Sequence, residues 1–215
     1  MPRPKRSTDK FEQELERLFL LHGVSALTVS DMATRLRCSR RHLYLFGSSK
    51  NEMFLNSIDG IFQRIREKGL LATTKAVEPI EKVAAYLQIG VRGTHSMSTV
   101  FMDDINRIPE ARRLLDEHQH LRCQGLEKLI IDGIRQGSFI KIHPGFMAQA
   151  AFAVAQRICE PEMYKATGLT IEEGFAEMGR LLRTGLMHSS HERLPPKGKD
   201  QAKRSRFGRG VRKSP

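Results

Sequence analysis

The spacing of apolar residues along the chain predicts helices and almost no strands. The first apolar stripe recurs at helical intervals and is followed by Gly23, a residue that commonly ends a helix. Alternating runs of β-branched or aromatic residues are absent, as are Asn-Gly turns. We therefore predict an all-α fold. The residues of this first stripe are Phe11, Leu15, Leu18, Phe19 and His22.

Three capping signals follow in close succession and predict short, closely spaced helices. Thr28, with Asp31 three residues later, precedes a short segment at 29–36. Ser39 precedes a second short segment at 40–46. Ser49 with Glu52 forms a capping box at the start of a long third segment.

Further along the chain, prolines and a second capping box mark where the later helices begin. Pro79 and Pro109 stand at first-turn positions, and the second of these helices continues to about residue 136, before Gly137. Pro144 opens a stretch at 145–159 that is apolar on nearly all faces, which indicates a helix buried in a core or against a partner. Thr170 with Glu173 predicts a last helix at about 171–188.

Length and composition favour a soluble globular protein of one or two domains. The chain has 215 residues, of which 40% are hydrophobic, and it contains no apolar run of 18 residues. The basic N-terminus lacks the apolar stretch of a secretory signal, and the three cysteines are odd in number and widely spaced. We therefore expect a cytoplasmic protein without contact to a membrane.

The net charge of +12 is concentrated at the two ends of the chain. Residues 1–50 carry 10 basic and 5 acidic side chains, a net charge of +5, and residues 192–215 carry 9 and 2, a net charge of +7. Residues 51–191 carry 17 of each and are neutral. A neutral body with two basic ends indicates a protein that binds a polyanion. The alternative interpretation is solubility charge together with a disordered tail.

The segment from residue 18 to residue 54 carries the functional signal, which is that of a helix-turn-helix. Met32, Ala33, Leu36, Cys38 and Leu43 have the spacing that packs two short helices together. The second helix of such a motif enters the major groove, where arginine suits guanine and hydroxyl groups suit phosphates. The candidate DNA contacts in and around this helix are Thr28, Ser39, Arg40, Arg41, His42 and Tyr44.

The stretch GVSALTVSDMATRLRCSRRHLYLFGSSKNEMF resembles the N-terminal region of the TetR family of bacterial transcriptional regulators. The resemblance covers about residues 8–56 and adds Lys50, at the start of the fourth helix, to the DNA-binding candidates. Two positions depart from the family pattern: Arg37 stands where a glycine is usual in the turn, and Gly47 where an aromatic residue is usual. A positive φ at Arg37 would cost about 1 kcal/mol. The residues in register are Gly23, Thr28, Met32, Ala33, Ser39, Leu43, Tyr44 and Lys50.

The resemblance implies two parts and a dimeric repressor. Residues 1–50 would bind DNA, and residues 51–190 would dimerise and bind a small-molecule effector. From residue 191 to residue 215 Pro, Gly, Lys and Arg dominate, and this composition predicts a disordered basic tail. Dimerisation through helices near 145–159 and 171–188 would let two heads read a palindromic operator, which the effector would release. The identity of this effector is unknown. Because methionine and aromatic residues adapt to apolar ligands, we expect pocket residues among Tyr86, His95, Met97, Phe101, Met102 and Phe152.

Two other classes of function compete with this prediction. His118 and His120 lie two residues apart on a helix, and no Cys-x-x-Cys pair, phosphate loop or nucleophile elbow is present, so we expect neither an enzyme nor a metal or other cofactor. We interpret Asp103–Asp104 and Glu172–Glu173 as solvated or capping charges. A DNA-coating protein that uses its basic tail without sequence preference remains the alternative function.

Overall fold

The computed structural model describes residues 8–94, 96–158 and 160–187. Within these residues the secondary structure is helical, with one isolated bridge between Phe139 and Met187 and no strand, which confirms the predicted all-α fold. None of the described helices is both long enough and apolar enough to cross a membrane. The helices are α1 (Thr8–His22), α2 (Val29–Arg35), α3 (Arg40–Leu43), α4 (Lys50–Thr73), α5 (Pro79–Thr94), α6 (Thr99–Arg107), α7 (Pro109–Arg135), α8 (Pro144–Ile158), α9 (Pro161–Thr167) and α10 (Ile171–Leu186).

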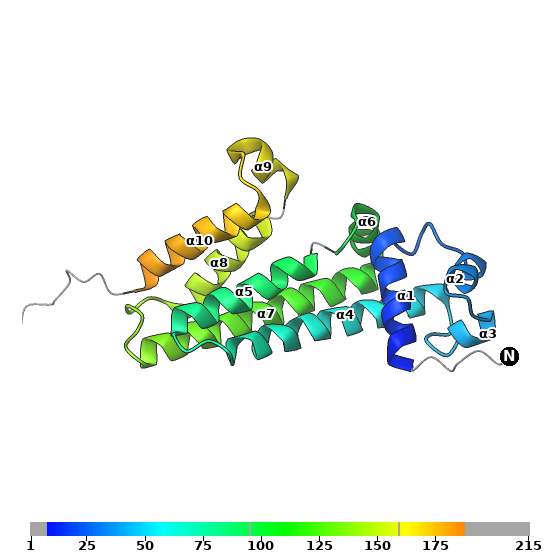
Figure 1. Cartoon of the computed structure of the whole chain (residues 1–215), viewed down its shortest axis with the longest axis horizontal. Helices are drawn as coiled ribbons and strands as arrows, with labels where there is room; N and C mark the ends of the chain where they lie inside the picture. The colour runs from blue at the N-terminus through cyan, green and yellow to red at the C-terminus, as the bar shows by residue number, and fades with distance from the viewer. Residues whose placement is uncertain (1–7, 95, 159, 188–215) are drawn as a thin grey trace, which may run out of the picture.

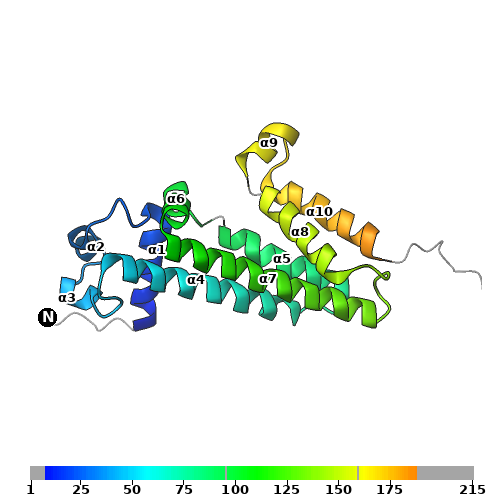
Figure 2. The same cartoon turned by 180° about the vertical axis from the view of Figure 1, so that it is seen from behind.

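Three long helices form the body of the molecule and separate its two ends. Helices α4, α5 and α7 run side by side along the long axis (Figures 1 and 2). Helices α1 to α3 pack around the first turns of α4 and form what we term the head, residues 8–49. Helices α8 and α10 pack on each other and on α7 and α5, while α6 lies between α7 and α1.

The capping residues behave largely as the sequence predicts. In α2 the Thr28 and Asp31 side chains each accept a hydrogen bond from the other's backbone N–H, at 3.1 and 2.9 Å. Thr170 and Glu173 form the same reciprocal pair at the start of α10. The box predicted at the start of α4 is wrong in one half. Ser49 accepts from the Glu52 N–H, but the Glu52 carboxylate accepts from Ser48 instead of Ser49.

Helix ends are predicted more reliably than short helices. Gly23 and Gly137 follow the helices they were expected to end, with φ of 66° and 71°. Helices α6 and α9 were not predicted from the sequence, and the short segment predicted at 40–46 is a helix only to Leu43, where α3 ends. Ser98 caps α6 by accepting a hydrogen bond from the Phe101 N–H at 3.1 Å, and a serine at this position is a local signal for the start of a helix.

The buried apolar residues form two clusters that meet along the long helices. The first joins α1 to α4 with α6 and the start of α7, and the second joins α5, α7, α8 and α10. The first cluster runs through residue 50, because Met53, Phe54 and Ile58 of α4 pack against α1. Packing is therefore continuous across the boundary that we place at residue 50, and the division into domains stays a prediction.

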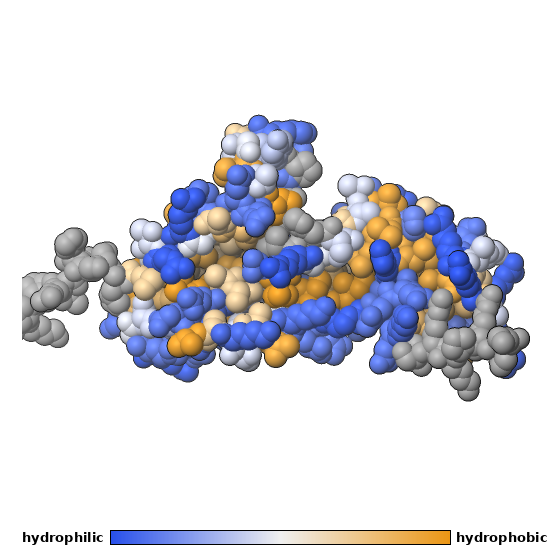
Figure 3. Space-filling model, viewed as in Figure 1, coloured by the Kyte–Doolittle hydropathy of each residue, from blue (hydrophilic) through white to orange (hydrophobic). Residues whose placement is uncertain are grey.

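Helix α8 is less buried in the single chain than its composition predicts. Ala148, Ala151 and Ile158 face the second cluster, but Phe146 is 68% exposed and Val154 is 44% exposed. The sequence allowed burial of α8 in a core or against a partner. In the single chain one face of α8 is buried in the core and the opposite face is exposed. In the space-filling view, apolar side chains also reach the surface over the middle of the molecule and at the base of the α8–α10 arm (Figure 3).

Candidate nucleic-acid interface

The turn between α2 and α3 is tight and depends on a strained residue. Arg37 has a φ of 51°, the left-handed conformation considered for this position from the sequence. This conformation costs about 1 kcal/mol in a residue with a Cβ. The Cys38 N–H donates to the Ala33 carbonyl at 3.0 Å and closes the turn. Met32 and Leu43 are fully buried between the two helices, so the crossing of α2 and α3 is fixed by packing.

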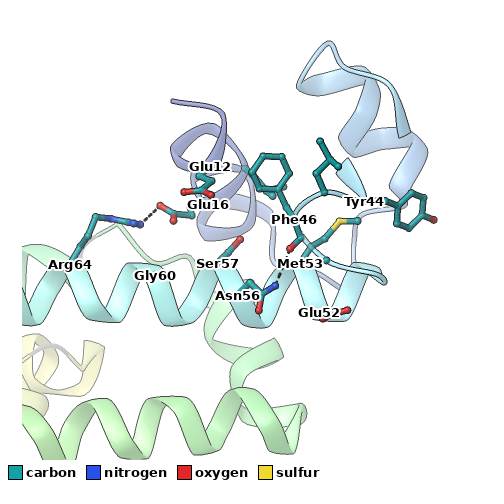
Figure 4. Close-up of a pocket in the computed structure, with 13 residues that line it drawn as sticks. Glu12, Glu16, Tyr44, Phe46, Glu52, Met53, Asn56, Ser57, Gly60 and Arg64 are labelled. Atoms are coloured by element: carbon teal, nitrogen blue, oxygen red, sulfur yellow. Dashed lines mark hydrogen bonds and ion pairs between the residues drawn. The ribbon is translucent and has the colours of Figure 1, made fainter. Parts of the chain in front are cut away.

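The exposed side of α3 is basic and aromatic. Arg40, Arg41 and Tyr44 are all exposed, and the two arginines stand four and three residues before the tyrosine, the spacing of one helical face. Arg37 is also exposed but lies in the turn before α3. Between residues 28 and 47, Asp31 is the single acidic residue of the sequence. The Tyr44 ring points away from α4 and toward the surface (Figure 4). The guanidinium and phenol groups of this face can donate hydrogen bonds to phosphate oxygens and to the acceptor atoms of base edges.

Thr28 and Ser39 stand at the N-termini of α2 and α3, as predicted, and both are exposed. The Thr28 hydroxyl is used locally, since it accepts from the Asp31 N–H and donates to the Asp31 carboxylate at 2.6 Å. The Ser39 hydroxyl oxygen accepts from the His42 N–H at 3.1 Å. Helix N-termini and their hydroxyls are suited to phosphate oxygens, so both positions stay in the DNA-binding proposal.

His42 and Lys50 are held by other groups of the protein. The His42 ring packs edge-on against Phe11, at 4.5 Å between ring centroids, and lies 5.6 Å from Phe46. Lys50 donates from Nζ to the carbonyl oxygens of Val24 and Leu27, at 2.8 and 2.7 Å. These contacts hold α3 and the α1–α2 loop in place, and the prediction that His42 and Lys50 contact DNA stays a prediction.

Gly47 departs from the family pattern for a packing reason. A Cβ at this position would lie 2.6 Å from the Met53 backbone nitrogen, so only glycine lets the chain pass this close to α4. Asn56 fixes the same loop by donating to the Phe46 carbonyl at 3.0 Å (Figure 4).

A hollow of about 430 Å³ lies beside this loop, between α1 and α4. Its lining includes the carboxylates of Glu12, Glu16 and Glu52. Glu16 forms an ion pair with Arg64 that ties α1 to α4 (Figure 4). Acidic walls repel phosphate, so the hollow is no part of the proposed DNA-binding face.

Asp104 links α6 to the head and was misread from the sequence as a solvated or capping charge. Its side chain is buried, and its carboxylate accepts from the Val24 N–H at 2.6 Å, the Ser25 N–H at 2.9 Å and the Ser25 hydroxyl. Burial raises the pKa of this carboxyl, but the hydrogen bonds from Ser25 and Val24 outweigh it and the net pKa is lowered. A second link is the Ser98 N–H, which donates to the Leu20 carbonyl at 3.0 Å.

The predicted effector-pocket residues do not converge on one site. Phe101 is buried in the first cluster, and Met97 and Met102 pack against that cluster. Tyr86 and Phe152 belong to the second cluster. His95 lies outside the described residues. The six residues therefore stay a prediction, and the structure separates the five described ones into two groups.

A polar centre that sequence reasoning missed lies between α4, α5 and α7. Arg122 is 3% exposed, donates from Nη2 to the Tyr86 carbonyl at 3.1 Å, and lies over the Tyr86 ring. The Tyr86 hydroxyl donates to the Arg122 carbonyl at 3.0 Å. His118, buried one turn before Arg122, stacks on Phe62 at 4.4 Å and contacts Arg66 through Nδ1 at 3.3 Å. In the part of the chain that the structure describes, no three His, Cys, Asp or Glu side chains gather as metal ligands.

Lowering the pH from about 7.5 to about 5 should destabilise the protein by about 2 kcal/mol through His118 alone. Burial and the nearby guanidinium groups of Arg122 and Arg66 lower the pKa of His118 to about 3. The unfolded histidine titrates near 6.5, so the unfolded state takes up the proton first and stability falls as the pH drops from about 6.5 toward 3. Urea unfolding at both pH values measures this, with His118→Phe as the control that keeps the stacking. If wild type and variant show the same pH dependence, the ring is not buried in its neutral form.

Comparison with known proteins gives the fold its context. No family model and no curated protein matches the chain. A protein from Saccharomonospora viridis described as a transcriptional regulator, solved in complex with choline, has a TM-score of 0.71 at 13% identity over 84% of this chain and 97% of its own. The TetR family regulator PfmR from Thermus thermophilus has a TM-score of 0.58 at 20% identity, with 84% and 100% covered.

A TetR transcriptional regulator from Chloroflexus aurantiacus has a TM-score of 0.66 at 14% identity, over 84% of this chain and 98% of its own. At these identities the likeness concerns the fold. The chain therefore has the all-helical fold of TetR-type transcriptional regulators, in agreement with the resemblance of residues 8–56.

Proposed function

We propose that this chain is a TetR-like transcriptional repressor that binds a palindromic operator as a dimer and is released by a small-molecule effector. The observation that carries the proposal is the exposed basic face of α3, presented by a tight helix-turn-helix on a fold shared with such regulators. In this motif the exposed face of the second helix enters the major groove. The proposed DNA contacts are Thr28, Ser39, Arg40, Arg41 and Tyr44.

The outer faces of α8 and α10 form the proposed dimer contact. Phe146 and Val154 are exposed on α8, and Leu181 is 72% exposed on α10. A Cβ at Gly185, one turn after Leu181 on α10, would meet no atom within 4 Å, so this face is open to close approach by a second helix. Two copies of α8 and α10 would form a four-helix contact around a two-fold axis. A dimer is needed because one short recognition helix reads only a few base pairs.

The effector would act by shifting the positions of the two heads. Helix α6 lies between the long helices and the head and holds the α1–α2 loop through Asp104. A movement of α5 or α7 is therefore transmitted to the head, which changes the spacing of the two recognition helices. An effector that binds the displaced form more tightly would shift the population away from the DNA-binding form.

Selection from a pool of random duplexes at moderate salt tests the proposed function. We expect a short palindrome to be enriched, and Arg41→Ala or Tyr44→Ala to weaken binding to it by about tenfold to a hundredfold. Arg135→Ala is the matched control, because Arg135 is an exposed arginine of α7 outside the head. Unselective recovery of duplexes, or equal losses in the variant and the control, would refute the proposal.

The alternative, a DNA-coating protein, is distinguished by salt and by truncation. Coating through the basic segment 192–215 would weaken equally on all duplexes as salt rises, whereas a repressor keeps its preference for one site. That segment lies outside the described residues. We expect a chain ending at Ser190 to lose affinity for every duplex and to retain its preference for the palindrome.

A further inference from the structure

Arg122 is a buried cation whose hydrogen-bonding capacity is not satisfied. Its side chain comes from the middle of α7, and the residue keeps a relative exposure of only 3%. Nη2 has the Tyr86 carbonyl as its acceptor, but Nη1 is buried and has no hydrogen-bond partner in the part of the chain that the structure describes. Leaving a charged donor unpaired in a low-dielectric interior costs several kcal/mol in free energy.

Glycines on all three long helices make room for this arrangement. A Cβ at Gly90 of α5 would lie 2.5 Å from Nη2 and 2.6 Å from Cζ of Arg122. A Cβ at Gly125 of α7 would collide with the Tyr86 hydroxyl, and one at Gly69 of α4 would lie 3.3 Å from the Tyr86 ring. The guanidinium and the phenol therefore occupy spaces that larger residues would fill. The sequence accommodates a buried charge at this point instead of excluding it.

The surroundings of Arg122 supply further positive charge and no counterion. Arg66 of α4 contacts His118, with its Nη1 at 3.3 Å from Nδ1 of that ring. Neither arginine forms an ion pair with an Asp or Glu of the described residues. Burial lowers the pKa of Arg122, but a guanidinium keeps its proton in proteins, so the charge persists. The centre therefore lacks one negative group.

We propose that Arg122 anchors the carboxylate of an organic acid, and that such an acid with an apolar body is the class of effector that this protein binds. That this acid acts as an effector rests on the proposed function. That it binds at this place rests on the buried guanidinium of Arg122. The carboxylate would accept hydrogen bonds from the unpaired Nη1, which converts an uncompensated charge into a charge-assisted pair. The apolar body would lie against the buried residues around it, which include Tyr86, Val83 and Leu126.

The positive charge of the site favours an anionic ligand, whereas one structural neighbour was solved with a cation. The Saccharomonospora viridis protein is solved with choline, which is a cation. Arg122 and Arg66 would repel a cation from the centre between α4, α5 and α7. The two proteins would thus bind ligands of opposite charge. Choline is therefore a control ligand that this chain is expected not to bind.

The same geometry explains how such a ligand would act on the head. Nη1 is buried, so a carboxylate would reach it only if the long helices packed around it moved apart. The form with this opening binds the acid, and the closed form does not, which is the differential affinity that a ligand-driven shift requires. Helix α6 connects α5 to α7 and carries Asp104, so the opening displaces the helix that holds the α1–α2 loop.

Thermal unfolding of the full chain with a series of straight-chain carboxylates from acetate to decanoate tests the proposal. We expect the longer acids to raise Tm by about 5 °C when present at about a hundred times Kd, and the alcohols of the same length and choline to have no effect. Arg122→Met should weaken binding of decanoate about a hundredfold. Without ligand, this variant should be at least as stable as the wild type, because a methionine replaces an unpaired charge by apolar volume.

Arg113→Met is the matched control, since Arg113 is an exposed arginine on the same helix, with a side chain 76% accessible. It should respond to decanoate as the wild type does. The proposal is overturned if no acid of the series raises Tm, if Arg122→Met responds like the wild type, or if inorganic phosphate stabilises the chain and the acids do not. These measurements contain no DNA, so a failure of operator binding would refute the proposed function and leave the acid site standing.

Discussion

Replacing Gly23 by alanine should lower the free energy of unfolding by about 3 kcal/mol or more, whereas Gly137→Ala should lower it by about 1 kcal/mol. Both glycines end a helix with nearly the same positive φ, 66° and 71°. Both variants therefore carry the same conformational penalty. They differ in what an added Cβ meets, because nothing lies within 4 Å at Gly137, while at Gly23 it would collide with Oδ2 of Asp104.

The collision is costly because Asp104 cannot move without losing its partners. Its carboxylate is buried and accepts three hydrogen bonds, from the backbone of Val24 and Ser25 and from the Ser25 hydroxyl. Displacing it leaves a buried charge and two backbone N–H groups unpaired, which costs about 1–3 kcal/mol for each group lost. Because this contact holds the head on α6, Gly23→Ala should also weaken operator binding, and Gly137→Ala should not.

Chemical denaturation of both variants, together with Gly23→Ala in an Asp104→Ala background, measures the effect. The double variant should be less destabilised than the sum of the two single variants, because removing the carboxylate makes room for the new methyl group. Equal destabilisation by Gly23→Ala and Gly137→Ala, or strict additivity in the double variant, would show that Asp104 does not hold the head as the structure describes.

The helix-turn-helix was predictable from the sequence because its signals are local. Thr28 and Ser39 cap helices that follow at once, Gly23 ends the helix before it, and the strained turn falls at Arg37. Each of these signals depends on residues within four positions of one another. The intramolecular contacts of His42 and Lys50 were not predictable in this way, since their partners Phe11, Val24 and Leu27 are set by the tertiary fold.

The polar centre was missed because polar residues were not expected in an apolar stripe. Leu115, His118, Arg122 and Leu126 recur at intervals of three and four and share the buried face of α7. Reading that stripe without regard to residue type would have placed His118 and Arg122 in the interior. Asp104 lies in the same way between Phe101 and Ile105 of α6. A charged residue in register with buried apolar neighbours is the signal that finds such sites.

If the proposed contact through α8 and α10 holds the dimer together, Leu181→Asp should convert the protein into a monomer. Leu181 is 72% exposed on α10, and in the proposed dimer each copy would bury it near the two-fold axis. Burial of a leucine stabilises by about 1.5–3 kcal/mol, and an unpaired buried carboxylate costs several kcal/mol, with both effects counted twice. Size-exclusion chromatography with light scattering should give the mass of one chain, 24.5 kDa, in place of twice that mass.

Leu71→Asp provides the matched control, because Leu71 is 61% exposed on α4, outside the proposed contact. It should leave the mass of the wild-type dimer unchanged, and both variants should keep the helical circular dichroism spectrum. Since the second head binds through an effectively intramolecular step, loss of the dimer should weaken operator binding by about a hundredfold or more. A Leu181→Asp protein that is still a dimer would place the contact elsewhere. A monomer that binds the palindrome as tightly as the wild type would instead mean that a single head recognises the operator.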